Sequence, residues 1–102
     1  MGLSISFKEY AKNDPASLDV QISDQMKELG YFFSTESKRD NQPWYPSPSA
    51  NELIEALGGE EAIVADYDNG DQFTVTHIET DKTVISNSSI SALAQLWIAI
   101  QA

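Results

Sequence analysis

"EAIVADYDNGDQFTVTHIETDKTVIS", residues 61–86, decides the fold, because apolar and polar residues alternate along it in three short runs. An alternation with period two indicates β-strands that bury one face. Asn69-Gly70 separates the first two runs and favours a type I′ hairpin turn, which needs positive φ at both central positions. A second turn at Thr80-Asp81 leads into the third run, residues 82–86. The stretch therefore predicts an antiparallel β-meander.

A helix is expected over residues 14–30, well before the meander. Asp14 can cap its first turn, Pro15 suits the first helical position, and Gly30 suits the left-handed conformation that ends many helices. Apolar residues recur at spacings of four and three, which places them on one helix face. These residues are Leu18, Ile22, Met26 and Leu29.

A second helix is expected over residues 49–57, directly before the meander. Ser49 followed by Glu52 is the pattern of a capping box, in which side chains satisfy the free amides of the first turn. Gly58-Gly59 then ends the helix.

The last helix is expected over residues 88–101, with Ser88 or Ser89 as its cap. It is apolar on most sides, which is typical of a helix that is buried on two faces or lies in a subunit contact. One small sheet offers little surface to cover so much apolar area. We therefore expect a symmetric homodimer.

The remaining segments have weaker patterns. Leu3, Ile5 and Phe7 alternate with serines, so residues 1–13 are expected to form an N-terminal arm or an edge strand. Residues 31–35, "YFFST", are a candidate aromatic strand, and the polar residues 36–43 are expected to form a loop.

These patterns together predict a single α+β domain over residues 1–102. It contains a small antiparallel β-meander of about three to four strands packed with about three helices, in the order α-(β)-α-β-β-β-α. The predicted core residues are Leu53, Leu57, Phe73, Val75, Leu93 and Trp97.

The charge is strongly acidic, with 16 acids and 6 bases for a net charge of −10. From Glu52 onward there are nine acids and one base, Lys82, for a net charge of −8. Such a surface repels phosphate backbones, which argues against direct binding of nucleic acid. An acidic surface attracts a basic partner instead, and it also keeps a protein soluble without any further role. The charge alone leaves both interpretations open.

The chain has no cysteine, which excludes a disulfide framework and thiolate metal sites. Its start lacks a basic segment followed by an apolar stretch, so we expect no secretory signal. No apolar run has the length of a membrane span, and we expect no membrane partner. The expected location is the cytoplasm.

No motif for catalysis, cofactor binding or metal binding emerges, so we expect a protein that is not an enzyme and has no cofactor. The acids of residues 66–71 do not fit the calcium-loop spacing, because glycine is fifth and His77 is twelfth when counted from Asp66. His77 is the single histidine and alternates with core residues of its strand, which favours a packed, hydrogen-bonded side chain.

Candidate contacts with a partner or ligand are therefore aromatic and acidic residues. Trp44 and Tyr45 stand between Pro43 and Pro46, where we expect no regular structure. One of the two is expected to pack against the core and the other to contact a partner, because neighbours in an extended chain point to opposite sides. The full candidate set is Tyr31, Phe33, Trp44, Tyr45, Glu60, Glu61, Asp66, Asp68 and Asp71.

"WYPSPSANELIEALGG", residues 44–59, followed by the meander and by "SSISALAQLWIAIQA", residues 88–102, resembles the phage ABA sandwich domain group. These are small proteins encoded by phages and prophages. The resemblance covers roughly residues 20–102, and this chain is more acidic after Glu52 than the group leads one to expect. The resemblance implies a phage or prophage gene and an intracellular setting, and it implies no catalytic residues.

Two functions follow as hypotheses. The first is a non-enzymatic phage accessory protein that binds a host protein with a basic nucleic-acid-binding surface, with inhibition of a defence system as one such role. The second is a module that binds or sequesters a small planar ligand, such as a nucleotide, between aromatic side chains. For the second, the candidate pocket residues are Tyr31, Phe32, Phe33, Trp44 and Tyr45.

Overall fold

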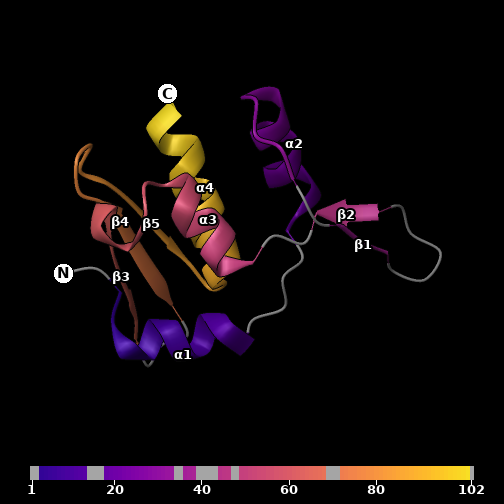
Figure 1. Cartoon of the computed structure of the whole chain (residues 1–102). Helices are drawn as coiled ribbons and strands as arrows, with labels where there is room; N and C mark the ends of the chain where they lie inside the picture. The colour runs from indigo at the N-terminus through magenta and orange to yellow at the C-terminus, as the bar shows by residue number, and fades with distance from the viewer. Residues whose placement is uncertain are drawn as a thin grey trace.

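The computed structural model describes residues 3–13, 18–33, 36–38, 44–46, 49–68 and 72–101, which form an α+β fold (Figure 1). The helices are α1 (Ile5–Asn13), α2 (Val20–Glu28), α3 (Ala50–Ala56) and α4 (Ser89–Gln101), with a short 3₁₀ helix η1 (Glu60–Ala62). The strands are β1 (Glu36–Lys38), β2 (Trp44–Pro46), β3 (Ile63–Tyr67), β4 (Phe73–His77) and β5 (Lys82–Ser86). The predicted fold class is confirmed.

The predicted meander is the three-stranded antiparallel sheet β3-β4-β5. Ala65, Val75 and Val84 lie opposite one another across it. Alternate residues of β3 and β4 are buried, as a period of two requires. The backbone N–H of Asp68 donates to the carbonyl of Gln72 at 3.0 Å and closes the first hairpin, while Asn69-Gly70 lies outside the described residues. Both predicted strand pairings are confirmed.

The second turn is held at Asp81, which has a φ of 58°. Its backbone N–H donates to the carbonyl of His77 at 2.8 Å. A single residue in the left-handed region is tolerated best for Gly, Asn and Asp. The turn predicted at Thr80-Asp81 is therefore present.

Helix α4 lies at the centre of the fold. It contacts β4 and β5, and it also contacts α1, α2 and α3. Ser88 caps it, because its Oγ accepts from the backbone N–H of Ser91 at 3.3 Å. Its buried residues are Ser89, Ile90, Ala92, Leu93, Ala94, Leu96 and Trp97. The helix is buried on two faces within one chain, so its apolar surface gives no argument for the homodimer.

The six predicted core residues are all buried, with exposed fractions between 0% and 9%. They come from α3 and its C-terminal cap Leu57, from β4 and from α4, which meet in one cluster. Phe7, Met26 and Ile63 complete this core from other elements, and Ile90 adds to it from α4.

The N-terminal segment is a helix, so the arm or edge strand predicted over residues 1–13 is wrong for residues 5–13. Before this helix, Leu3 forms an isolated parallel bridge to Ala65 of the sheet, and the backbone N–H of Ser4 donates to the carbonyl of Ala65 at 3.0 Å. The Oγ of Ser4 then accepts from the backbone N–H of Phe7 at 3.1 Å and starts α1. Phe7 and Ala11, four residues apart, are buried, whereas Ile5 is 78% exposed. Burial on one helical face outweighs the short alternation.

Helix α2 begins later than predicted. Asp19 is its cap, with the side chain accepting from the backbone N–H of Gln21 at 3.1 Å. Asp14 and Pro15 lie outside the described residues. Leu29 is 47% exposed because the helix has already ended there, and Gly30 adopts the expected positive φ of 98°.

The segment between α2 and α3 differs most from the prediction. Residues 31–33 form no strand, and residues 36–38 pair antiparallel with residues 44–46, with Ser37 opposite Tyr45. Regular structure was not expected beside the prolines or in the polar stretch. A two-stranded ribbon accepts Pro46 because an edge strand does not need every backbone N–H for its ladder. The ribbon projects from the body of the fold (Figure 1).

Candidate functional site

A groove runs between α1 and α3, and it has a volume of about 440 Å³. Its floor is apolar, and four of its five floor residues are nearly fully buried, with exposed fractions between 0% and 8%. The floor residues are Leu3, Phe7, Ala11, Ile54 and Ile90. Ala50 lines the same groove from the first turn of α3. The volume lies in the range of sites that bind small ligands or side chains.

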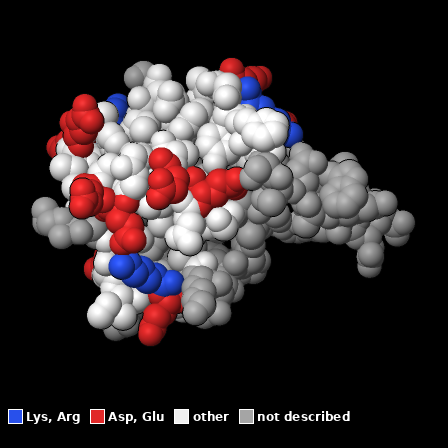
Figure 2. All heavy atoms as spheres, viewed as in Figure 1, with Lys and Arg blue, Asp and Glu red and all other residues white. Residues whose placement is uncertain are grey.

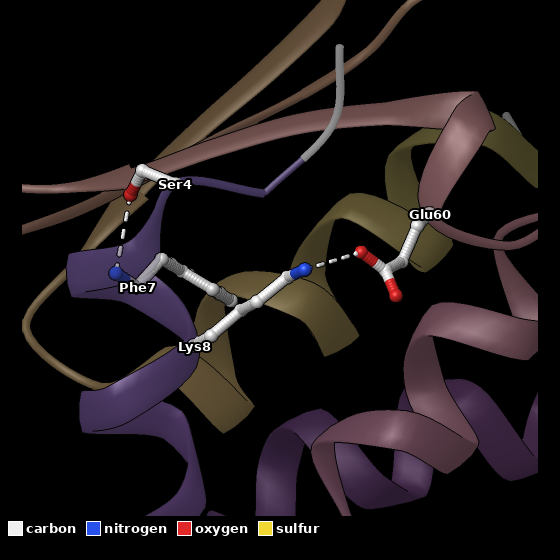
Figure 3. A network of polar contacts seen from close by, with 4 residues as sticks. All are labelled: Ser4, Phe7, Lys8 and Glu60. Carbon is white, nitrogen blue, oxygen red and sulfur yellow. Dashed lines mark hydrogen bonds and ion pairs between the residues drawn. The ribbon is translucent and has the colours of Figure 1, made fainter.

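The rim of the groove is polar and is formed by Lys8, Ser49, Asn51 and Glu60. Lys8 reaches from α1 toward η1, where its Nζ lies 3.0 Å from Oε1 of Glu60 (Figure 3). Both side chains remain about half exposed, at 52% and 55%. An ion pair in that much water contributes little to stability. It is therefore available to exchange partners.

The segment that contains α3 and η1 carries four carboxylates, and Glu52, Glu55, Glu60 and Glu61 are here called the acidic face. Of these, Glu60 lines the groove. Residues 49–62 contain these four acids and no Lys or Arg. Figure 2 shows acidic side chains gathered where Figure 1 places α3 and the segment that follows it. Three of the four are exposed, and Glu52 is partly buried.

Local backbone geometry brings α3 and η1 together. The Oγ of Ser49 accepts from the backbone N–H of Glu52 at 3.1 Å, which is the serine half of the predicted capping box. After α3, Gly58 and Gly59 have φ values of 109° and 94°. An added Cβ at Gly58 would lie 3.0 Å from the Cβ of Ala62. Glycine is the residue that adopts such positive φ values readily, and the turn leads from α3 into η1, which carries Glu60 and Glu61.

The other predicted acids lie elsewhere. Asp66 is exposed, on the face of β3 away from the core, and its Oδ1 accepts from the backbone N–H of Tyr67 at 2.9 Å. Asp68 follows β3, whereas Glu61 precedes it. The two residues are therefore separated by the length of the strand, roughly 16 Å. Asp71 is outside the described residues. The predicted acids that the structure describes thus form no single cluster, and of these Glu60 and Glu61 belong to the acidic face.

Tyr31 and Phe33 pack toward the core, whereas Phe32 is 83% exposed. The Tyr31 ring lies 4.8 Å from the ring of Phe33 and 5.1 Å, edge to face, from Trp97. Burial raises the pKa of Tyr31, and the negative charge of Glu52 adds to this effect. None of these aromatics lines the groove, and the side chains of Trp44 and Tyr45 lie outside the description.

Sequence reasoning missed the groove because it placed no helix at residues 5–13. The signal was Ser4 followed by Phe7 and Ala11, a cap and a spacing of four. The floor also needs Ile54 and Ile90 from two distant helices, which no local pattern brings together.

His77 is buried, as its position among core residues predicted. Its Nδ1 lies 2.9 Å from the hydroxyl oxygen of Thr80 and accepts the backbone N–H of Thr80 at 3.4 Å. The side chain therefore stabilises the turn between β4 and β5.

Within the described part of the chain, no three His, Cys, Asp or Glu side chains are placed to hold a metal ion. None of the helices described there has the length and apolar character needed to cross a membrane. The groove and the acidic face are candidate binding sites on the described surface. Comparisons with known protein families, with characterised proteins and with solved structures find no match to this chain.

Proposed function

We propose that this protein is a non-enzymatic binding protein whose acidic face docks on a basic surface of another protein. The observation that carries the proposal is the continuous acidic segment from Ser49 to Ala62, in which exposed carboxylates stand on a capped helix and a tight glycine turn. These elements fix the backbone from which the carboxylates extend before binding, which lowers the ordering cost of association.

The biological setting in this proposal is a phage or prophage gene acting on a bacterial host protein. The resemblance of residues 44–59 and 88–102 to the phage ABA sandwich domain group supports that setting. A basic nucleic-acid channel is a suitable target, because a row of carboxylates can occupy the sites that normally receive phosphates. Inhibition of a defence system that acts on nucleic acid is then the expected consequence.

The test is affinity capture from a bacterial lysate with two variants that carry equal charge changes. Glu55→Lys with Glu61→Lys reverses two charges of the acidic face, and both side chains are exposed. Asp24→Lys with Glu28→Lys reverses two exposed charges on α2 as the control. We expect the wild type and the α2 variant to retain the same basic protein at low salt, and the acidic-face variant to lose it.

Competition with double-stranded DNA adds the functional readout. If the partner presents a nucleic-acid channel, added DNA should release it from the immobilised protein, because the two ligands occupy one basic surface. Equal retention by both charge-reversed variants would show that the acidic face is not the binding surface. Retention that DNA does not affect would exclude the nucleic-acid channel as the target.

A further inference from the structure

We propose that the groove between α1 and α3 receives the apolar side chains of a basic amphipathic helix. This inference rests on the proposed function, since the helix would belong to the basic partner. It adds a specific apolar binding site to a contact that is otherwise electrostatic.

The groove has the form that an amphipathic helix recognises. Such a helix places apolar side chains three and four residues apart in a groove between two helices. Here α1 contributes Phe7 and Ala11, α3 contributes Ala50 and Ile54, and Ile90 of α4 closes the floor. The described chain leaves about 440 Å³ between these residues, which is room for more than one side chain.

The charge around the groove selects a basic helix over an acidic one. Glu60 stands on the rim, and Glu61 follows it as an exposed residue of η1. Glu55 lies four residues after the rim residue Asn51, so it is the next side chain along that helix surface. A helix with an apolar stripe flanked by Lys or Arg would place its bases beside these carboxylates.

Lys8 opposes such a helix and competes with it. Its Nζ already pairs with Glu60 at 3.0 Å across the rim (Figure 3). An incoming base must share or replace this contact, and the positive charge of Lys8 repels it. Removal of Lys8 should therefore strengthen binding, which is the opposite of what the loss of a merely structural contact would do.

Three synthetic peptides of equal length, about 14 residues, separate the contributions of shape and charge. The first has Leu at helical spacing with Lys elsewhere, the second replaces each Leu with Ser, and the third replaces each Lys with Glu. Fluorescence anisotropy at about 50 mM salt measures binding where surface charges are weakly screened. The Leu/Lys peptide should bind at least about tenfold more tightly than the Ser/Lys peptide, since burial of one Leu suffices for that factor.

Two matched variants then test whether the peptide binds in the groove. Asn51→Phe fills the groove from an exposed rim position, whereas Ala56→Phe puts the same ring on an exposed position of α3 that does not line the groove. We expect Asn51→Phe to weaken binding of the Leu/Lys peptide by about tenfold and Ala56→Phe to leave its binding unchanged. Lys8→Ala should strengthen it by about two- to fivefold, the size of one exposed charge contact. Circular dichroism confirms that each variant is folded.

The groove proposal is overturned if the Leu/Lys and Ser/Lys peptides bind equally, or if Asn51→Phe and Ala56→Phe behave alike. The acidic face could still bind a basic protein in either case, and the lysate capture decides that question separately. Native mass spectrometry of the purified protein provides the remaining outcome. A small molecule that is present in the wild type and absent from Asn51→Phe would assign the groove to a small ligand and overturn the helix proposal.

Discussion

Tyr10 of α1 stacks on Tyr67 at the end of β3, with ring centroids 4.2 Å apart and an angle of 23° between the rings. Phe7, one turn earlier, meets Phe73 edge to face at 5.5 Å. These contacts fix α1 against the sheet and bring Lys8 and Ala11 to the groove. The N-terminal helix is therefore part of the fold and forms one wall of the candidate site.

Replacement of Phe7 tests this arrangement. Phe7 is 0% exposed, so Phe7→Ala should lower the free energy of unfolding by about 3–5 kcal/mol through lost burial and a cavity. Ile5→Ala, at a 78% exposed position of the same helix, should change it by less than about 0.5 kcal/mol. Urea unfolding followed by circular dichroism measures both, and equal losses would show that α1 is not docked as described.

The helix α1 illustrates what the sequence could not decide. Leu3, Ile5 and Phe7 alternate like a strand, while Phe7 and Ala11 have the spacing of a helix. Both patterns are short, and the choice between them depends on the aromatic residues of β3 and β4. The ribbon β1–β2 was missed for a related reason, because its three-residue strands pair across a polar stretch with no strong turn signal.

Elements with strong local signals were predicted well. The two turns of the meander have residues typical of turns, and α3 has a serine cap and ends at glycine. Helix α4 has apolar residues at helical spacing and the Ser88 cap. The acidic face could be predicted in part, because Glu60 and Glu61 follow α3 directly. The groove could not, since Ile54 and Ile90 belong to different helices.

Replacement of Leu93 tests the central role of α4. Leu93 is 0% exposed, and Leu93→Ala should lower the free energy of unfolding by about 2–5 kcal/mol. Gln101→Ala at the exposed end of the same helix is the matched control and should have almost no effect. Thermal and urea unfolding both report the difference, and a loss of only a few tenths of a kcal/mol at Leu93 would contradict the packing of α4.

Tyr31 predicts a pH dependence of stability. Its pKa is raised from the ordinary value of 10.0 in the folded protein, first by burial and then by the charge of Glu52. Above pH 10 the unfolded chain therefore releases the Tyr31 proton before the folded protein does, and stability falls as the pH rises. Well below pH 10 both states hold the proton, and this residue contributes no slope.

Tyr31→Phe removes the titrating group and keeps the ring contact with Trp97. The melting temperature of the wild type should fall more steeply than that of Tyr31→Phe between about pH 9.5 and pH 11.5. The comparison cancels the other tyrosines, because both proteins contain them. Parallel curves over this range would show that Tyr31 titrates normally.

Trp44 and Tyr45 carry the final prediction. They occupy successive positions of β2, opposite Lys38 and Ser37, in a ribbon that projects from the body of the fold (Figure 1). Successive residues of a strand face opposite sides, so we expect their substitutions to differ. One of Trp44→Ala and Tyr45→Ala should lower the melting temperature, and the other should leave it unchanged while it weakens capture of the partner, because exposed aromatic residues are common in binding hot spots. Differential scanning fluorimetry and the lysate capture described above measure the two effects on the same samples. Equal destabilisation by both substitutions, with capture unchanged at a temperature where both variants are folded, would show that the two side chains stabilise the fold and do not contact the partner.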